Sequence, residues 1–401
     1  MKTAFDALCR ADSLCLDRAE LLLDGLSRFP SSRGRESFRK ALEDARTLLA
    51  NSHPQNAFGR LFGRHLLHGW RLLEELVELR WHWPGASPAP LLAALAGEDT
   101  LSRLEAAVAA IDSEAIWDYL QRLGSYRVDR LPVTAAMEQI EQVAARTKSE
   151  LTAWLDASGY DLPGLDAELV VAPDPGQHCY YQHRAHRIVL AAGVFMVFSR
   201  GGGVRVNPAG ALTSLAHELL GHAVQDTLCD DLPEPLHPGR RSALRLSSQV
   251  AAEGLAEHTF SLVRRFAAER GKQLGLDTGD VELIDSEARL GSAFHALPAL
   301  AHYARMQSAY DPGFDPHGYL AEVAGHDGFG ELLSACQPQP RLLLYEASTW
   351  FGTEMVRETE ETLVEQGITR AESWRRLARG AWSTDTYREA VAYNVCQELE
   401  R

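Results

Sequence analysis

Residues 216–222 have the sequence AHELLGH, which holds two imidazoles and a carboxylate that directly follows the first of them. Imidazole nitrogens are common ligands of Zn²⁺, and in zinc peptidases with an HExxH motif the intervening glutamate takes a proton from the water that the metal activates. His217 and His222 are therefore candidate zinc ligands. Glu218 is the candidate general base.

The two histidines stand five positions apart, one more than in HExxH. In a regular α-helix five residues rotate the second side chain by about 140° from the first, which would point the imidazoles apart. A π-bulge takes up one extra residue per turn and would return both rings to one face. The spacing therefore predicts a π-helical distortion, and Gly221 is a residue that tolerates it.

A third ligand is needed, because catalytic zinc sites usually have three protein ligands and one open position. The candidate is Glu253, which lies in an apolar-periodic segment that we predict to be one helix from about residue 241 to 270. Glu257 lies one turn further along the same face. We expect it to accept a hydrogen bond from a ligand imidazole and so to fix the tautomer of that ring.

These motifs resemble those of three groups of metalloenzymes. HELLGH is similar to the zinc motif of dipeptidyl peptidase III, and HExxxH followed by EGLA at residues 253–256 resembles the tyrosine carboxypeptidases that trim tubulin and their bacterial relatives named for a QEGLA motif. GHAVQ at residues 221–225, with the same EGLA, is similar to the GHHxQ and EGWA motifs of a group of bacterial hydrolases.

All three groups belong to, or look like, the gluzincin type, in which two histidines and one distant glutamate hold the zinc. The resemblance covers about residues 205–260. It implies His217, His222 and Glu253 as ligands and Glu218 as the base, in a gluzincin-like domain. The chain has Ala252 where the QEGLA relatives have glutamine, so the role of that glutamine is not carried over.

Peptide hydrolysis also needs a hydrogen-bond donor for the oxyanion of the tetrahedral intermediate. Tyr345 is the first candidate, because similar families place a tyrosine in a late helix of this kind; the alternative is a tyrosine of the core. The other candidates, for each of which a structural role is favoured, are His258, His295, His302 and Tyr303.

The sequence leaves three functions open. The favoured one is a zinc metallopeptidase, of which a carboxypeptidase-like enzyme is one form, acting on a peptide or peptide-like substrate. The second is a zinc amidohydrolase or a tailoring enzyme that acts on a small or ribosomally made peptide. The third is a non-catalytic helical interaction protein with a structural metal, although such sites normally have four protein ligands.

The elements that must position these residues are mostly helices. Apolar residues return every three or four positions up to about residue 160, and short β-branched or aromatic segments at 168–172, 179–182, 187–190 and 203–206 predict one small sheet. Asn207-Pro208 is typical of the start of a helix. We therefore predict a mainly α fold, with a helical bundle region at 1–165 and a zinc metallohydrolase catalytic domain at 166–401.

The strand segment at 178–183 has a possible second use, because an edge strand beside the zinc helix can pair with an extended peptide substrate through its main chain. The alternative is a half-buried hairpin, since aromatic residues favour any pleated surface.

Composition restricts the partners. The chain has 401 residues, 45% of them hydrophobic, and a formal net charge of -15, which argues against nucleic acid. Its longest apolar stretch, residues 188–198, is too short to span a bilayer, and its first residues lack the apolar core of a signal peptide. We expect a cytoplasmic protein without a membrane partner.

The cysteines have no CxxC spacing, so no disulfide framework or thiolate metal site is expected.

Overall fold

The computed structural model describes residues 2–23, 32–52, 56–82, 84–116, 137–173, 179–198, 204–206, 208–237, 246–278, 280–281, 284–285 and 293–396. Its α-helices are α1 (Lys2–Leu23), α2 (Ser32–Ser52), α3 (Ala57–His82), α4 (Ala89–Ala96), α5 (Thr100–Ala109), α7 (Met137–Ala157), α8 (Pro208–Ala216), α9 (Val224–Leu228), α10 (Leu246–His258), α11 (Phe260–Leu274), α13 (Ala293–Tyr310), α14 (Pro316–Ala324), α15 (Gly330–Ala335), α16 (Pro340–Glu365), α17 (Arg370–Ala378) and α18 (Tyr387–Ala392). Its strands are β1 (Glu168–Ala172), β2 (Tyr180–Gln182), β3 (Arg187–Ala191), β4 (Met196–Phe198) and β5 (Val204–Val206). The prediction of a mainly α protein is confirmed.

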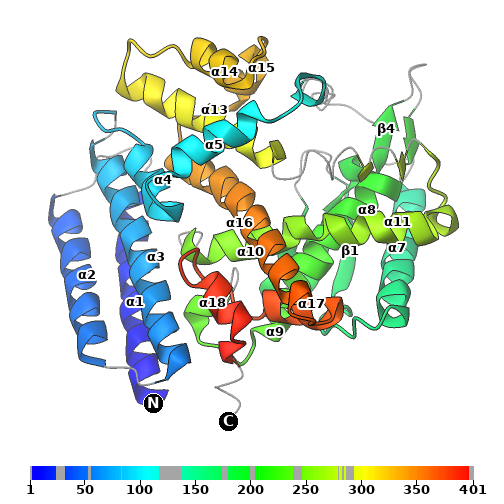
Figure 1. Ribbon diagram of the computed structural model, residues 1–401, viewed down its shortest axis with the longest axis horizontal. Helices are drawn as coiled ribbons and strands as arrows, with labels where there is room; N and C mark the ends of the chain where they lie inside the picture. Colours follow the sequence, from blue (N-terminus) through cyan, green and yellow to red (C-terminus); the bar gives the residue numbers. More distant parts are fainter. Residues whose placement is uncertain are drawn as a thin grey trace.

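The first three helices lie side by side at one end of the molecule (Figure 1). The apolar residues that recur along α3, among them Phe62, Leu66 and Trp70, are all buried. The indole of Trp70 also donates a 2.9 Å hydrogen bond to Asp12 of α1. The periodicity therefore places one face of α3 in the core, as amphipathic patterning requires.

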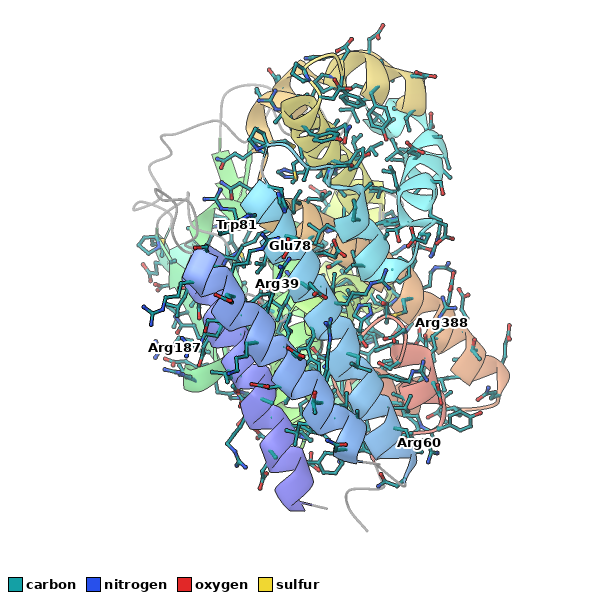
Figure 2. All side chains as sticks on the ribbon, turned by 90° about the vertical axis from the view of Figure 1, so that its left-hand side faces the viewer. Arg39, Arg60, Glu78, Trp81, Arg187 and Arg388 are labelled. Atoms are coloured by element: carbon teal, nitrogen blue, oxygen red, sulfur yellow. The ribbon has the colours of Figure 1, made fainter. Side chains whose placement is uncertain are left out.

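The outer surface of this bundle carries ion pairs between α2 and α3 (Figure 2). Arg39 donates a 2.9 Å hydrogen bond to Glu78, and the guanidinium of Arg35 lies 4.9 Å from the ring centroid of Trp81. Half-exposed pairs of this kind fix the register of two helices more than they stabilise them, because water screens the attraction.

The sheet prediction is right for three strands and wrong for the fourth. The order is β1-β3-β2, with β1 parallel and β2 antiparallel to β3, so β2 is an edge strand. The segment predicted at 203–206 instead contributes β5, which pairs with β4 in a separate antiparallel ribbon. β4 lies inside the apolar stretch 188–198 that continues from β3, so the pattern of apolar residues does not show where one sheet ends and the other begins.

Two helices, α10 and α16, cross near the centre of the molecule at very short range (Figure 1). A Cβ atom on Gly352 of α16 would lie 2.0 Å from the carbonyl oxygen of Val250, and one on Gly254 of α10 would lie 2.3 Å from the carbonyl carbon of Gly352. Only glycine fits at both positions. The glycine of the EGLA motif therefore has a packing role.

The single helix predicted over 241–270 is wrong. The structure has α10 and α11 with a break at Thr259, and residues 238–245 lie outside the described residues, as does the predicted N-cap Asn207. The Thr259 hydroxyl donates a 2.6 Å hydrogen bond to the carbonyl of Ala256, which competes with the helical pattern of that turn.

Buried polar contacts join the first helices to the end of the chain. His65 of α3 accepts a hydrogen bond from the backbone N–H of Ser383 at 3.0 Å, and its other nitrogen lies 3.1 Å from the carbonyl of Pro235.

The domain boundary near residue 165 stays a prediction. In the described part of the chain no helix is long and apolar enough to cross a membrane.

Candidate metal centre

Residues His217–Ala223 form a π-helix, continuous with α8 before it and α9 after it. At its end the backbone N–H of Val224 bonds the carbonyl of Leu219, five residues back. The imidazoles of His217 and His222 consequently lie on one side, with ring centroids 5.0 Å apart. The distortion that the five-residue spacing predicts is confirmed.

Gly221 has a second reason to be glycine. A Cβ atom at this position would lie 2.4 Å from Cα of Ala256, so the π-helix and α10 touch backbone to backbone. Glu253 stands one turn before Ala256 on α10. The close approach therefore brings the carboxylate of Glu253 to the two histidines.

The three side chains meet in one place. Oε2 of Glu253 lies 3.8 Å from Nε2 of His217 and 3.9 Å from Nε2 of His222, and the three ligand atoms are all within 4.8 Å of one another. Among the described residues these three form the group of histidine and carboxylate side chains that could hold a metal ion. Burial and the charge of Glu257 raise the pKa of the Glu253 carboxyl group. A bound cation would favour the charged carboxylate and would lower this pKa again.

Glu257 lies behind His217. Its Oε1 is 3.0 Å from Nδ1 of His217, which leaves the Nε2 of that ring directed to the ligand group. Burial lowers the pKa of His217, but the hydrogen bond and charge of Glu257 outweigh it and raise the pKa to about 9. Burial and the charge of His217 lower the pKa of His222, so this second imidazole is neutral and ready to bind a metal.

Glu257 itself is held by a further histidine. His295 of α13 lies with Nε2 3.6 Å from Glu257 and with Nδ1 2.8 Å from Glu346 of α16. Hydrogen bonds to both carboxylates outweigh burial and raise the pKa of His295 to about 10. The hydrogen bonds of His217 and His295 hold the pKa of Glu257 below its usual value in spite of burial. A chain of alternating charges thus runs from the candidate ligand His217 to α16.

Glu218 lies close to this candidate ligand group and is not part of it. Its side chain is 4% exposed, and the backbone N–H of Tyr181 in β2 donates a hydrogen bond to its carboxylate. Its Oε2 atom is shielded from solvent and has no hydrogen-bond partner in the described part of the chain. Burial outweighs the charge of His217 and raises the pKa of Glu218 to about 7, near the value that suits a general base.

Tyr345 of α16 stands at the edge of this group, with 36% of its surface exposed. Its hydroxyl is a hydrogen-bond partner of the Glu253 carboxylate. The charge of Glu253 and burial raise the pKa of Tyr345 well above its usual value, so the phenol keeps its proton and can donate it in a hydrogen bond.

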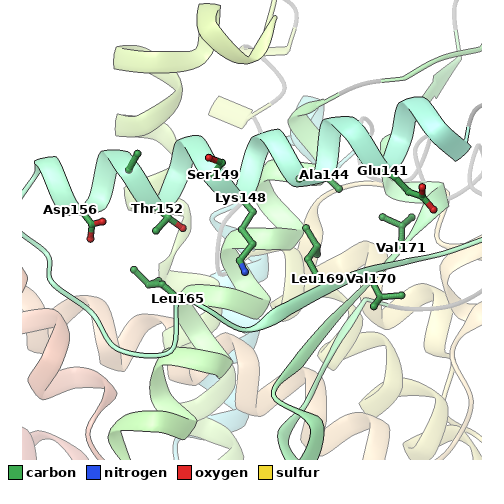
Figure 3. A pocket seen from close by; sticks show the side chains of 12 residues that line it. Glu141, Ala144, Lys148, Ser149, Thr152, Asp156, Leu165, Leu169, Val170 and Val171 are labelled. Atoms are coloured by element: carbon green, nitrogen blue, oxygen red, sulfur yellow. The ribbon is translucent and has the colours of Figure 1, made fainter.

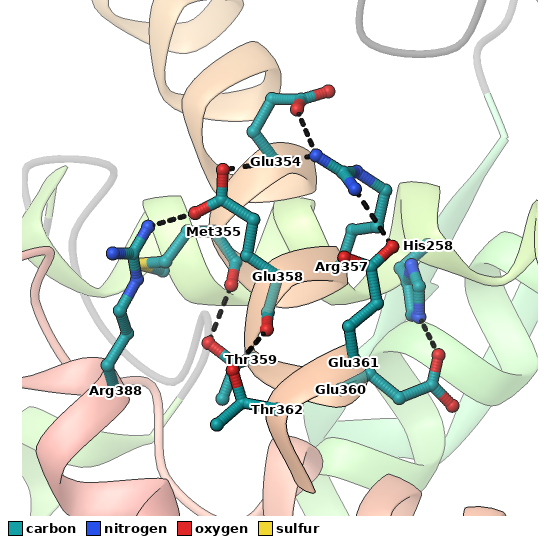
Figure 4. Close-up of polar contacts among 10 residues, drawn as sticks. All are labelled: His258, Glu354, Met355, Arg357, Glu358, Thr359, Glu360, Glu361, Thr362 and Arg388. Atoms are coloured by element: carbon teal, nitrogen blue, oxygen red, sulfur yellow. Dashed lines mark hydrogen bonds and ion pairs between the residues drawn. The ribbon is translucent and has the colours of Figure 1, made fainter. Parts of the chain in front are cut away.

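Three of the other candidates have partners elsewhere. His258 bonds Glu360 of α16 at 2.8 Å, beside the ion pairs of Arg357 (Figure 4). His302 bonds the carbonyl of Gln337 at 2.9 Å, and the ring of Tyr303 lies 6.2 Å from that of Tyr319. Of the rivals to Tyr345, only His295 is brought into the charged chain around Glu257.

Sequence reasoning missed several groups around the site. Glu346, the partner of His295, was not singled out, although it follows Tyr345 directly. Asp226 was also missed: it contacts His183, the last residue of the predicted strand segment, whose first residue His178 lies outside the described residues. The spacing of Asp226, four residues after His222, was the available signal.

A cavity of about 810 Å³ lies elsewhere, between α7 and β1, and none of the residues of the metal centre lines it. Figure 3 shows Lys148 of α7 extending into it between Leu165 and Leu169.

Comparison of the chain with protein-family models, with curated proteins and with solved structures gives no match.

Proposed function

We propose that this protein is a zinc-dependent hydrolase that cleaves peptide bonds, with His217, His222 and Glu253 as zinc ligands. The observation that carries the proposal is the convergence of two Nε2 atoms and one carboxylate oxygen within 4.8 Å, beside a buried carboxylate that belongs to none of them. Two imidazoles and one carboxylate are a ligand set that suits Zn²⁺ and leaves one position open.

The residues present fit the metal in two further respects. The carboxylates of Glu253 and Glu257, which are 15% and 17% exposed, lie together in a site that a divalent cation would neutralise. The contact between Glu257 and Nδ1 of His217 is the outer contact that metal-bound histidines commonly have. Zn²⁺, when bound, would supply Lewis-acid chemistry by lowering the pKa of water and polarising a carbonyl group.

The protein's own groups would carry the proton. Glu218 takes one proton from the attacking water at its carboxylate, while the water oxygen bonds to the carbonyl carbon. Glu218 then gives this proton to the amide nitrogen as the C–N bond breaks, which yields a carboxylic acid and an amine. The backbone N–H of Tyr181 keeps the carboxylate in place, and Tyr345 is the candidate donor to the carbonyl oxygen.

The two other functions predict different behaviour. A structural metal site is normally closed by a fourth protein ligand, and the group formed by the described residues has three. An amidohydrolase or tailoring enzyme would use the same residues on a smaller substrate. We favour the peptidase because the edge strand β2 lies against the π-helix, so an extended chain has a strand to lie along beside the candidate metal centre.

The test is a digest of a peptide library by the zinc-loaded protein, with metal content measured on the same sample. We expect about one zinc per chain and cleavage that chelation abolishes and added zinc restores. The matched control is Glu218→Gln, which keeps the shape and the zinc but loses roughly 10²- to 10⁴-fold in rate. Undiminished cleavage by zinc-loaded Glu218→Gln would refute its role, and zinc-loaded wild-type protein that cleaves no peptide would refute the peptidase.

A further inference from the structure

The cavity between α7 and β1 contains one cation beside an apolar wall. Its volume of about 810 Å³ lies in the range of sites that bind small molecules. Lys148 extends into it from α7, and Leu165, Leu169 and Val171 line the side that faces the helix (Figure 3). Leu169 and Val171 stand two positions apart in β1, so they point to the same face of the sheet. The cavity therefore offers a charge and a hydrocarbon surface next to each other.

Small side chains on α7 leave the room for this cavity. Ala145, Ser149 and Ala153 all line it at intervals of four residues, so they lie along one stripe of the helix. A helix that packs directly on its neighbours fills the space between them with larger side chains, because protein interiors are close-packed. Along this stripe the described side chains do not fill the space.

The ammonium group of Lys148 forms no ion pair in the described part of the chain. It donates a hydrogen bond to the carbonyl oxygen of Ala167, which is a neutral acceptor, and an ammonium group has three donors. The charge of Asp166 acts on it, but that side chain is 88% exposed and lies 3.3 Å from His186. Burial lowers the pKa of Lys148 in spite of Asp166. An anionic ligand would supply the counter-charge that the protein does not.

A second polar group of the cavity lacks a partner. The hydroxyl of Thr152, one turn after Lys148 on α7, is shielded from solvent and has no hydrogen-bond partner among the described residues. A buried hydroxyl without a partner is unfavourable, and a hydrogen bond to it would be stabilising. Lys148 with donors to spare and Thr152 with no partner therefore indicate where the oxygen atoms of a ligand would lie.

The acidic residues of the cavity lie at its two ends. Glu141 and Asp156 are exposed and stand seven and eight residues from Lys148, which is about 10 and 12 Å along the helix (Figure 3). At such distances exposed charges are largely screened, because the Debye length is about 8 to 10 Å. They do not neutralise Lys148, but they would repel a second anionic group at either end. The charges therefore suit a ligand with one anionic group and an uncharged remainder.

We propose that this cavity binds a monocarboxylate with an aliphatic chain. The carboxylate accepts hydrogen bonds from Lys148, and the chain lies against Leu165, Leu169 and Val171. A carboxylate supplies the missing counter-charge, and each methylene group that the wall buries strengthens binding about fourfold. The proposal does not depend on the hydrolase function, because no residue of the candidate metal centre lines the cavity.

The probe is decanoate, titrated into the full-length protein by calorimetry at neutral pH and below the concentration at which it forms micelles. Decanol has the same chain without the charge, decanedioate carries a second carboxylate, and hexanoate has four methylene groups fewer. We expect one decanoate to bind per chain. Decanol and decanedioate should each bind at least roughly tenfold more weakly, because one lacks the charge-assisted hydrogen bond and the other meets an acidic end. Hexanoate should also bind at least roughly tenfold more weakly.

Variants test the two walls separately. Lys148→Met removes the charge and should weaken decanoate binding roughly 10- to 100-fold, whereas Lys148→Arg keeps the charge and should bind within about tenfold of the wild type. Ala145→Phe fills the cavity from the stripe of small residues and should abolish binding. The matched controls are Lys272→Met on α11 and Ala157→Phe at the end of α7. Both positions are exposed and outside the cavity, so both controls should bind decanoate like the wild type.

A measurement on the unaltered protein locates the ligand even if a variant does not fold. The chain has four lysines, so their acetylation by a limiting amount of reagent can be followed residue by residue with mass spectrometry. We expect saturating decanoate to slow the acetylation of Lys148. The acetylation of Lys40 and Lys272, which are exposed, should not change.

Equal decanoate affinity in the wild type and folded Lys148→Met, or unchanged acetylation of Lys148 at saturation, would overturn the proposal. Equal affinity for decanol and decanoate would also overturn it, because the cavity would then recognise the chain and not the carboxylate. Absence of saturable decanoate binding excludes this class of ligand. If tetraglutamate slows the acetylation of Lys148 and decanoate does not, the cavity takes an acidic polypeptide and the proposal is wrong.

Discussion

Gly221 of the π-helix and Ala256 of α10 approach so closely that a Cβ atom on the glycine would lie 2.4 Å from Cα of the alanine. One of these segments carries both histidines of the candidate ligand group and the other carries Glu253. Their separation is therefore set by the absence of a side chain at residue 221. The geometry of the candidate metal centre therefore depends on this packing contact as well as on the three side chains.

The first prediction follows from this contact. Gly221→Ala must push α10 away from the π-helix, so we expect a loss of about 1 to 3 kcal/mol in the free energy of unfolding and at least roughly tenfold weaker zinc binding. Thermal unfolding and competition with a chelator measure the two effects. Gly330→Ala is the control, because its Cβ atom would meet only His317, at an ordinary 3.6 Å. Unchanged zinc affinity in Gly221→Ala would show that α10 can shift freely.

The second prediction separates the ligand carboxylate from the base. Glu253→Gln removes the anion from the ligand group. Loss of an outer contact alone lowers metal affinity roughly 10- to 100-fold, so loss of a ligand charge should lower zinc affinity by more than about 100-fold. Glu218→Gln should keep its zinc. Glu361→Gln, at a side chain that is 58% exposed, is the control and should match the wild type. Equal zinc affinity in Glu253→Gln and the control is the outcome that excludes Glu253 as a ligand.

The third prediction concerns Glu257, which contacts Nδ1 of His217 at 3.0 Å and is itself held by His295. Replacement by glutamine keeps the size of the side chain but removes the charge that orients the imidazole. We expect a roughly 10- to 100-fold loss of zinc affinity, measured by chelator competition at about pH 9, where a proton on His217 no longer competes strongly with the metal in the wild type. A variant that binds zinc like the wild type would mean that packing alone orients His217.

Local features of the site could be predicted from the sequence, because short-range chemistry decides them. The five-residue spacing of His217 and His222 required a π-helix, and strands β1 to β3 follow from β-branched and aromatic segments bounded by turn residues. The one-turn spacing of Glu253 and Glu257 put both carboxylates on one face of α10.

Contacts between distant segments could not be predicted. His295 and Glu346 come from α13 and α16, and nothing in their local sequence indicates that His295 lies between Glu257 and Glu346. The crossing of α10 and α16 depends on Gly254 and Gly352 facing each other, a pairing that periodicity does not reveal. Helix packing is decided by the fit of whole surfaces, which a pattern along one segment does not contain.

The last prediction is that zinc binding strengthens as the pH rises. Burial lowers the pKa of His217, but Glu257, Glu218 and Glu253 outweigh it and raise the pKa to about 9 in the metal-free protein. At neutral pH this imidazole therefore carries a proton that Zn²⁺ must displace. Because the metal-free state binds more protons than the zinc state below this pKa, zinc affinity should rise about tenfold per pH unit from about pH 7 and level off near pH 9.

Calorimetry in two buffers of different ionisation enthalpy measures the proton that His217 releases, and chelator competition measures the affinity. Glu257→Gln is the informative comparison, because it removes the anion that raises the pKa of His217 most and should flatten the pH dependence above neutrality. His222 adds nothing to this slope, since burial and the charge of His217 lower its pKa and leave no proton to displace. A wild-type affinity that stays constant from pH 7 to about pH 9 would contradict a protonated His217 and with it the charged chain through Glu257.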